Sequence, residues 1–353
     1  MQLARRVRHP IVWLPISVAL LGLLVWRSRL WEAGPLLSRV DPLPLLGALA
    51  ICAAAPILWA IRSAGLLAAA DQPVGILPLI PMTSFANTVN NITPGSTGEV
   101  FRLWLLRAHH GVDYATGGAV IVIERLVAFA YLAGSAVLLW LAYVGALPIA
   151  LAAGLVVLLL ASPAIVYRIG LRPSRVVAVL PLGGLVGADR WQRFVGFLAR
   201  VDATVARLIS HPGRVAAFAV ATAGLLVCYA TQLVLVGRAL GVSLDPVAAW
   251  GALGIALTAG VLSLLPFGLG SADLVLVALL GVAGVPGTEA AAMAFGYRLV
   301  STLPLGLAGV ASYAWLSARL PAEGIDAGAV RAAIAGQGDD RDATGAVLPP
   351  ASR

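Results

Sequence analysis

The sequence NTVNNITPGSTGEVFRLWLLRAHHGVDYATGGAVIVIER, residues 87–125, interrupts a chain that otherwise consists almost entirely of apolar runs. Amides, a Pro-Gly dipeptide and charged side chains lie close together in it: Asn87, Asn90, Asn91, Pro94, Gly95, Glu99, Arg102, Glu124 and Arg125. Ionised and polar groups are costly near the centre of a bilayer, so a chain that keeps them there is expected to use them. We therefore interpret the rest of the chain around this stretch.

The composition identifies a polytopic membrane protein. Of the 353 residues, 60% are hydrophobic and only 11% are charged, whereas soluble domains carry roughly 25% charged residues. The basic residues are all arginines, and they flank apolar runs instead of forming a basic face with interleaved aromatics. We therefore expect membrane phospholipids as partners, and no nucleic acid.

Apolar runs and their breaks predict about six full spans and two re-entrant hairpins. The full spans are expected at residues 11–26, 43–67, 117–144, 148–166, 215–235 and 288–316. The helices of the hairpins, 76–93 with 99–108 and 247–265 with 272–280, are too short or too interrupted to cross the roughly 20-residue bilayer core on their own. The residues that break them are Pro94, Gly95, Gly98, Pro266, Gly268 and Gly270.

The second hairpin repeats the pattern of the first. Pro94 precedes Arg125 by 31 residues, Pro266 precedes Arg298 by 32, and in both copies a Gly-Val pair lies 14 residues before the arginine. We predict two repeats, at about 43–166 and 215–318, joined by an arginine-rich connection at 167–214. Counting the spans from a cytoplasmic N-terminus places the two repeats in opposite orientations in the membrane. Inverted repeats with broken helices are a transporter architecture.

The distribution of arginines predicts the orientation. Eight arginines lie between residues 167 and 214, and more precede the first apolar run, so both regions are expected in the cytoplasm. Within the connection, apolar residues at helical spacing lie opposite arginines, which predicts an amphipathic helix on the membrane surface. The tail, 319–353, is expected to be disordered, with both termini cytoplasmic and the chain in the plasma (inner) membrane.

Two interpretations of the charged residues stay open. Arg125 and Arg298 could attract the phosphate of a lipid headgroup, because a guanidinium matches two phosphate oxygens at once. Alternatively, acid and arginine form structural ion pairs that hold each hairpin to its long helix. The asparagines could line a polar path or cap broken backbone. We predict a headgroup or translocation path lined by Asn87, Asn91, Glu99, Arg102, Glu124, Arg125, Asp273, Tyr297 and Arg298.

The chain contains no motif of an enzyme active site, phosphate loop or metal centre. We therefore expect it to have no catalytic residues, no cofactor and no metal site of its own.

The stretch from Thr93 to Leu132 resembles the lysylphosphatidylglycerol synthase transmembrane family, also called flippase-like. The residues that carry this resemblance are Pro94, Gly95, Gly98, Glu99, Arg102, Glu124 and Arg125. The second signature of the family is matched by Pro266, Gly268, Gly270, Asp273, Tyr297 and Arg298, with Phe267 in place of a usual glycine and Asp273 in place of a usual glutamate.

The resemblance covers residues 10–318 and implies movement of lipids, such as aminoacylated phosphatidylglycerol, between leaflets. Some family members carry an aminoacyl-transferase domain after this region, and because only a short tail follows Arg319 we expect none in this chain. Our hypothesis is a lipid flippase acting on an anionic or aminoacylated phospholipid. The alternatives are the membrane subunit of a lipid-modifying or glycosyl-transferring system that works with a separate soluble enzyme, and a scaffold. A homo-oligomer is a further expectation.

Overall fold

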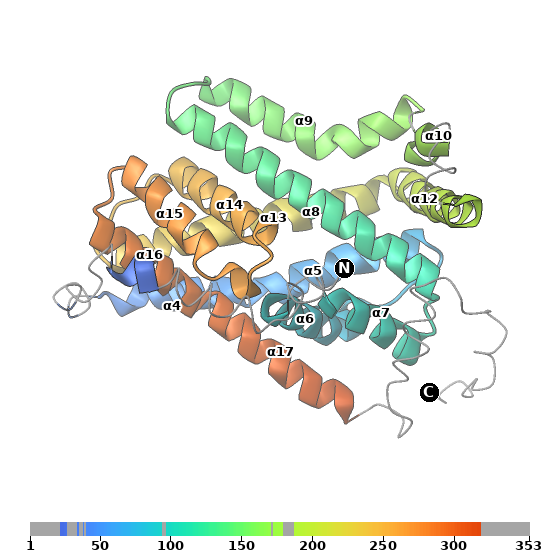
Figure 1. Cartoon of the computed structure of the whole chain (residues 1–353), viewed down its shortest axis with the longest axis horizontal. Coiled ribbons are helices and arrows are strands. Elements are labelled where there is room, and N and C mark those ends of the chain that lie inside the picture. Colours follow the sequence, from blue (N-terminus) through green and yellow to red (C-terminus); the bar gives the residue numbers. More distant parts are fainter. Residues whose placement is uncertain are drawn as a thin grey trace.

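The computed structural model describes residues 22–26, 34, 38, 40–93, 97–170, 172–178 and 187–318, and every regular element among them is a helix. Figure 1 shows an elongated bundle in which most helices run roughly along the long axis. The predicted all-α fold is confirmed. Most of the predicted first span, the break at Pro94 and Gly95, and the tail 319–353 lie outside the described residues.

Two segments of equal length cross the bundle side by side. They are α4 (Pro42–Cys52) with α5 (Ala54–Ala69), and α13 (Pro212–Ala239). At one end Asp41 N donates to Ala239 O at 2.9 Å, and at the other Arg214 Nη1 donates to Ala68 O at 3.3 Å. The two segments therefore run antiparallel, which is the relation expected between the first elements of inverted repeats.

Aspartates determine where several of these helices begin. Asp41 precedes α4 and Asp245 precedes α14 (Pro246–Leu262), and each side chain accepts a hydrogen bond from a backbone N–H of the first turn. In both places a proline follows, and its fixed φ suits the first helical position. Asp113 starts α8 (Tyr114–Tyr143) in the same way, accepting from Thr116 N at 2.9 Å.

The two predicted hairpins are present. The first is α6 (Ile76–Ile92) with α7 (Thr97–His110), and the second is α14 with the 3₁₀ turn η2 (Pro266–Gly268) and α15 (Ser271–Val282). Figure 1 shows them at opposite ends of the long axis, with η2 packed against α6. At 17 residues each, α6 and α14 are shorter than a membrane span. The hairpins therefore reach toward each other from opposite ends.

Each hairpin packs against a long helix of the other half. The last segment is α16 (Gly287–Val300) with α17 (Thr302–Ser317). α6 packs against α17, and α14 packs against α8. Small residues allow this close packing: a Cβ on Gly309 would lie 1.9 Å from Thr88 Oγ1, and one on Gly254 would lie 2.5 Å from the Ala136 Cβ. The two halves are thus interlocked.

The last long helix, predicted as continuous over 288–316, is broken at Ser301. Pro304 explains the break, because it lacks the N–H that would bond to Val300 O and its ring crowds that carbonyl. Pro56 likewise lacks the N–H that would bond to the backbone oxygen of Cys52, and α4 ends at Cys52. The two kinks touch, since Cys52 Sγ donates to Ser301 O at 3.6 Å.

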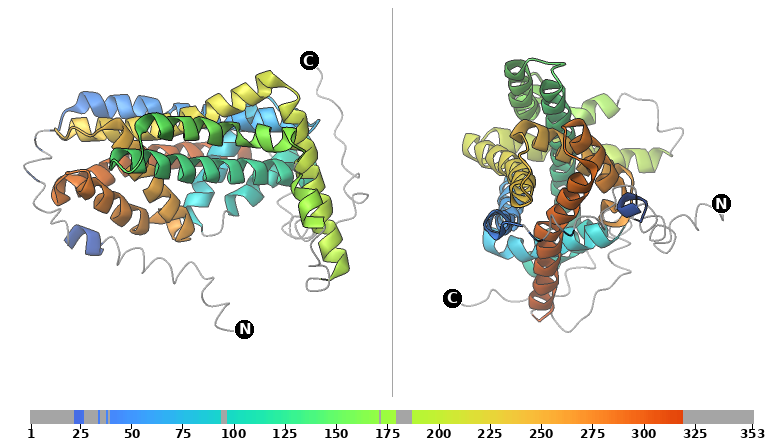
Figure 2. Two further views of the ribbon diagram at one scale, coloured as in Figure 1. Left: turned by 90° about the horizontal axis from the view of Figure 1, so that it is seen from above. Right: turned by 90° about the vertical axis from the view of Figure 1, so that its left-hand side faces the viewer.

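The connection between the halves forms helices at one end of the bundle. They are α10 (Pro173–Ala178) and α12 (Ala188–Ile209), which follow α9 (Ile149–Arg168). The left view of Figure 2 shows α12 lying steeply across the other helices. Val201, Val205 and Leu208 are buried, whereas Arg200 and Arg207 are exposed. This is the amphipathic helix predicted for the connection, in a position that suits a membrane surface.

Four helical segments in the described residues are long and apolar enough to cross a membrane: Pro42–Ala69, Tyr114–Tyr143, Pro212–Ala239 and Gly287–Ser317. In α9 the apolar part, Ile149–Ile165, is shorter. Two apolar core clusters lie among these helices, one around the first hairpin and α12 and the other around the second hairpin. The chain is therefore a multi-pass membrane protein, and the charged residues described below are exceptions in an apolar interior.

Candidate functional site

Glu99 lies at the centre of a charged cluster formed by the first hairpin. It is the third residue of α7, and its side chain is 9% exposed. One carboxylate oxygen accepts from Asn90 Nδ2 at 2.9 Å and from Arg125 Nη2, and the other lies 3.4 Å from Arg102 Nη1. The carboxylate thus connects α6, α7 and α8 at the level where the hairpin turns.

A second glutamate extends the cluster to α5. Glu124 Oε2 accepts from Arg102 Nη1 at 2.6 Å, and Glu124 Oε1 accepts from Ser63 Oγ at 2.6 Å. Arg62 Nη2 donates to the backbone oxygen of Glu124 at 2.9 Å. All four of these residues are buried. Buried charges persist only when they are paired and hydrogen-bonded, and this network supplies both conditions.

A cavity of about 200 Å³ opens beside these charges. One water molecule needs roughly 10–15 Å³ of such space, so the cavity holds several waters or a small polar group. Its walls come from α5, α6, α7, α8 and α13, and thus from both halves of the chain: Trp59, Arg62, Thr83, Ala86, Asn87, Glu99, Arg102, Glu124, Arg125, Ala128, Leu132, Thr222, Leu225, Leu226 and Tyr229.

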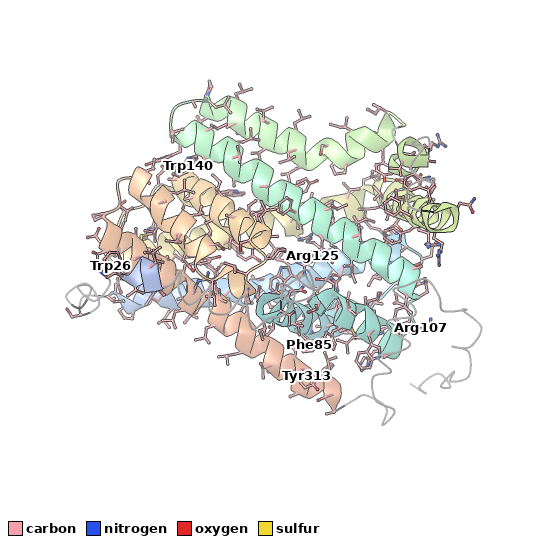
Figure 3. The ribbon with its side chains drawn as sticks, in the orientation of Figure 1. Trp26, Phe85, Arg107, Arg125, Trp140 and Tyr313 are labelled. Carbon is pink, nitrogen blue, oxygen red and sulfur yellow. The ribbon has the colours of Figure 1, made fainter. Side chains whose placement is uncertain are left out.

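Arg125 connects the cavity with the outside of the bundle. Its side chain is 49% exposed, whereas those of Arg102 and Glu99 are 5% and 9% exposed. Figure 3 shows Arg125 near the middle of the long axis, with Arg107 close to one end and Trp140 toward the other. A position roughly 18 Å along a helix of about 45 Å agrees with this depth. The guanidinium is therefore accessible near the middle of the long axis of the bundle.

The cluster carries more positive than negative charge. With every group ionised, Arg62, Arg102 and Arg125 face Glu99 and Glu124, which leaves one net positive charge. The Nε atoms of Arg62 and Arg102 are buried and have no hydrogen-bond partner. The net positive charge of its lining therefore suits the cavity to an anion.

The second hairpin has an ion pair of its own. Arg298 Nε donates to Asp273 Oδ1 at 2.6 Å, and Arg298 Nη2 donates to Asp273 Oδ2 at 2.8 Å. Asp273 Oδ2 also accepts from Gly270 N at 2.9 Å, and Arg298 Nη2 lies 3.4 Å from Gly268 O. Gly268 and Gly270 have positive φ, a conformation that favours glycine. This pair secures the turn of the second hairpin.

The predicted site residues thus fall into two groups. Asn87, Glu99, Arg102, Glu124 and Arg125 line the cavity together. The described lining of the cavity does not include the other four predicted residues, Asn91, Asp273, Tyr297 and Arg298. Asp273 and Arg298 instead pair at the second hairpin, Tyr297 is buried in the apolar cluster there, and Asn91 is half-buried on α6.

The predicted hairpin breaks have different roles. A Cβ on Gly98 would lie 2.0 Å from the backbone oxygen of Ala86, so this glycine allows α6 and α7 to approach closely. Pro266 begins η2. Pro94 and Gly95 lie outside the described residues.

Sequence reasoning missed Arg62 and Ser63, which bring α5 into the cluster. Arg62 lies seven residues before the end of α5 and resembles, in sequence alone, an arginine that flanks a span. The available signal was its depth, since roughly 10 Å of helix separates it from the end of α5.

The described residues contain no group of three His, Cys, Asp or Glu side chains that could hold a metal ion. His109 and His110 end α7, and partial burial lowers the pKa of both imidazoles.

Among known proteins, the chain matches a family of membrane proteins. No curated protein and no solved structure matches the chain. Residues 11–309 match the family model described as the lysylphosphatidylglycerol synthase TM region, a match that includes both hairpins and the charged cluster. The chain therefore belongs to the lysylphosphatidylglycerol synthase transmembrane-region family.

Proposed function

We propose that this protein translocates an anionic or aminoacylated phospholipid between the leaflets of the plasma membrane. Its family suggests a membrane protein of lipid metabolism or transport. The observation that most supports the finer proposal is the cavity with one net positive charge, reached through the half-exposed side chain of Arg125. A lipid phosphate is an anion that the surrounding membrane can supply to such a cavity.

The size of the cavity suits a headgroup and not a whole lipid. About 200 Å³ accommodates a polar headgroup fragment, whereas two acyl chains need far more space. In the proposed mechanism the headgroup moves through the protein while the acyl chains stay in the surrounding hydrocarbon. The protein then removes the main cost of translocation, which is the transfer of an ion from water into an apolar medium.

An incoming headgroup phosphate can replace Glu99 as the hydrogen-bond partner of Arg125. Without lipid, Glu99 accepts hydrogen bonds from Arg125, Arg102 and Asn90. An incoming phosphate competes for Arg125, because a guanidinium binds phosphate and carboxylate in the same forked geometry. Glu99 keeps its two other donors during the exchange, so the carboxylate does not become an unpaired buried charge.

The two hairpins provide a route to both leaflets. They approach the middle of the bundle from opposite ends (Figure 1), and the Pro56 and Pro304 kinks meet between the halves. Broken helices of inverted repeats are the elements that open alternately in many transporters.

Transbilayer movement in liposomes tests the proposal. Full-length protein is reconstituted with fluorescent phosphatidylglycerol, and an impermeant reductant bleaches the label in the outer leaflet. We expect wild type to expose inner-leaflet label and Arg125→Ala to slow this roughly tenfold to hundredfold, because hydrogen bonds to charged groups contribute about 1.5–3 kcal/mol.

Arg238→Ala is the matched control, since Arg238 is exposed at the end of α13 and the change in net charge is the same. No movement by wild type beyond that of protein-free liposomes would contradict the proposal, and so would equal rates for wild type and Arg125→Ala. Chemical change of the labelled lipid, followed by mass spectrometry, would favour the membrane subunit of a lipid-modifying system instead.

A further inference from the structure

The two halves of the chain correspond element by element. Pro42–Ala69 and Pro212–Ala239 each contain 28 residues, and α6 and α14 each contain 17. Positive φ occurs two residues after the end of α5 and of α13, at Asp71 and Gly241. It recurs three residues before α8 and α16 begin, at Gly111 and Gly284. Residues that have the same number, counted from the start of corresponding helices, can therefore be paired between the two halves.

This alignment makes the two ion pairs equivalent. Glu99 is the third residue of α7, and Asp273 is the third residue of α15. Arg125 is the twelfth residue of α8, and Arg298 is the twelfth residue of α16. Each half thus holds its hairpin to its long helix with an acid and an arginine in the same places.

The remaining charges of the cluster have no ionised counterpart. Arg62 is the twenty-first residue of its 28-residue segment, and Gln232 occupies that place in the second half. By the same count, Leu276 corresponds to Arg102 and Tyr297 corresponds to Glu124. Three buried charged side chains therefore belong to the first half alone, at sites where the same architecture tolerates neutral residues.

The two equivalent pairs also differ in geometry. Asp273 and Arg298 share two hydrogen bonds, and the Arg298 side chain is 17% exposed. Arg125 contacts Glu99 through Nη2, and its side chain is 49% exposed. The Asp273–Arg298 pair is bonded on both carboxylate oxygens and lies at the hairpin turn. The Glu99–Arg125 pair borders the cavity, where part of the Arg125 guanidinium is accessible to a ligand.

We infer that a phosphate-bearing anion binds in the first half only, held by Arg62, Arg102 and Arg125, and that Asp273–Arg298 is a structural pair. Arg62 is then a specificity-determining residue of the site. The inference rests on the proposed function only for the source of the phosphate, a lipid headgroup; free phosphate shares the same chemistry.

The chemistry of the cavity supports a phosphate. One net positive charge matches a phosphodiester, which carries one negative charge, and several oxygens satisfy several guanidinium donors at once. Arg62 and Arg102 line the cavity and are 6% and 4% exposed. The Phe218 ring lies 5.3 Å from Arg62 Cζ, which helps to hold this guanidinium in place.

Ligand-dependent thermal stability tests the inference on the full chain purified in a phosphate-free maltoside detergent. A ligand that binds the folded state raises the melting temperature with its concentration. The probes are short-chain phosphatidylglycerol and inorganic phosphate. We expect short-chain phosphatidylglycerol to stabilise wild type, and Arg62→Gln, which installs the residue found in the second half, to weaken its apparent affinity at least tenfold.

Two paired variants separate the halves without changing the net charge of either half. Glu99→Gln with Arg125→Gln is expected to weaken phosphatidylglycerol binding at least tenfold. Asp273→Asn with Arg298→Gln makes the same change in the second half and is expected to leave the affinity within twofold, even if the protein without ligand melts at a lower temperature.

Equal weakening by the two paired variants would overturn the inference, and so would unchanged affinity in Arg62→Gln or no stabilisation of wild type by either probe. Stabilisation by inorganic phosphate as strong as that by the lipid, lost in Arg62→Gln, would support the anion site and identify free phosphate as its source. Binding that depends on Arg62 in a protein that moves no lipid would refute the proposed function and leave this site intact.

Discussion

At the scale of single residues, Glu124 is the acceptor on which most of the buried network depends. Its carboxylate is the acceptor for both Arg102 and Ser63, and its backbone oxygen is the acceptor for Arg62. Removing one partner from a buried ion pair is far more destabilising than the pair is stabilising, because the other charge stays desolvated.

Glu124→Gln should therefore destabilise the fold by about 3–5 kcal/mol. The measurement is the melting temperature in detergent, with Asp71→Asn as the control. Asp71 pairs with Arg207 through side chains that are 72% and 45% exposed, so its loss should cost about 0.2–1 kcal/mol. Asparagine also tolerates the positive φ of residue 71. Equal shifts in the two variants would show that the Glu124 network is not a buried unit that depends on this carboxylate.

Much of the charged cluster could be predicted from the sequence, because Glu99, Arg102, Glu124 and Arg125 are close along the chain and each is unusual in an apolar environment. Arg62 and Ser63 could not be predicted, since their approach to Glu124 depends on the packing of α5 against α8. The assignment of Asp273 and Arg298 to a common path relied on the repeat alone, and a repeat predicts equivalent places in two halves without predicting a shared cavity.

At the scale of secondary-structure elements, the first hairpin depends on one close contact. A Cβ at position 98 would lie 2.0 Å from Ala86 O and 2.7 Å from Asn90 Oδ1. Both distances are far below van der Waals contact, and the nearest atom belongs to the rigid backbone of α6. The helices could accommodate a side chain only by moving apart, which would also move Glu99 away from Asn90.

Gly98→Ala should accordingly destabilise the protein by about 1–3 kcal/mol and slow lipid movement in liposomes. Gly65→Ala is the matched control: it lies inside α5, a Cβ there meets nothing within 4 Å, and alanine should stabilise that helix by up to about 1 kcal/mol. Melting temperatures that shift in opposite directions would agree with the structure. A Gly98→Ala protein as stable as wild type would show that α6 and α7 pack less closely.

Element type and approximate bounds followed from hydrophobic runs and from Gly/Pro breaks, which is why both hairpins and α12 were predicted close to their observed positions. The break at Ser301 was missed although Pro304 was visible, because a proline inside an apolar run either bends or ends a helix, and neighbouring helices decide which. Pro81 and Pro163 lie within α6 and α9, which both continue past them.

At the scale of the whole molecule, the interlocking of the halves connects the two ends of the bundle. α6 packs on α17 and α14 packs on α8, so neither half can move without changing the packing of the other. The Asp273–Arg298 pair and the Glu99–Arg125 pair therefore belong to one mechanical unit, with the charged site located in one half of it.

The orientation of the bundle in the membrane is the last prediction. α13 contains 28 residues and is therefore about 42 Å long, which exceeds the roughly 30 Å thickness of the hydrocarbon core. Ser210 precedes this helix, beside the arginines of α12, and Ser243 follows it; both are exposed. Because arginine-rich connections stay in the cytoplasm, we expect Ser210 on the cytoplasmic side and Ser243 on the outer side.

Single cysteines at these positions, in a background with Cys52 and Cys228 replaced by alanine, provide the measurement. An impermeant maleimide added to intact cells should label Ser243→Cys, and Ser210→Cys should react only after the membrane is permeabilised. The reverse pattern would place α12 on the outer surface and invert the proposed topology. Labelling of both positions in intact cells would mean that α13 does not cross the membrane, and a path for lipid between the leaflets would then lose its structural basis.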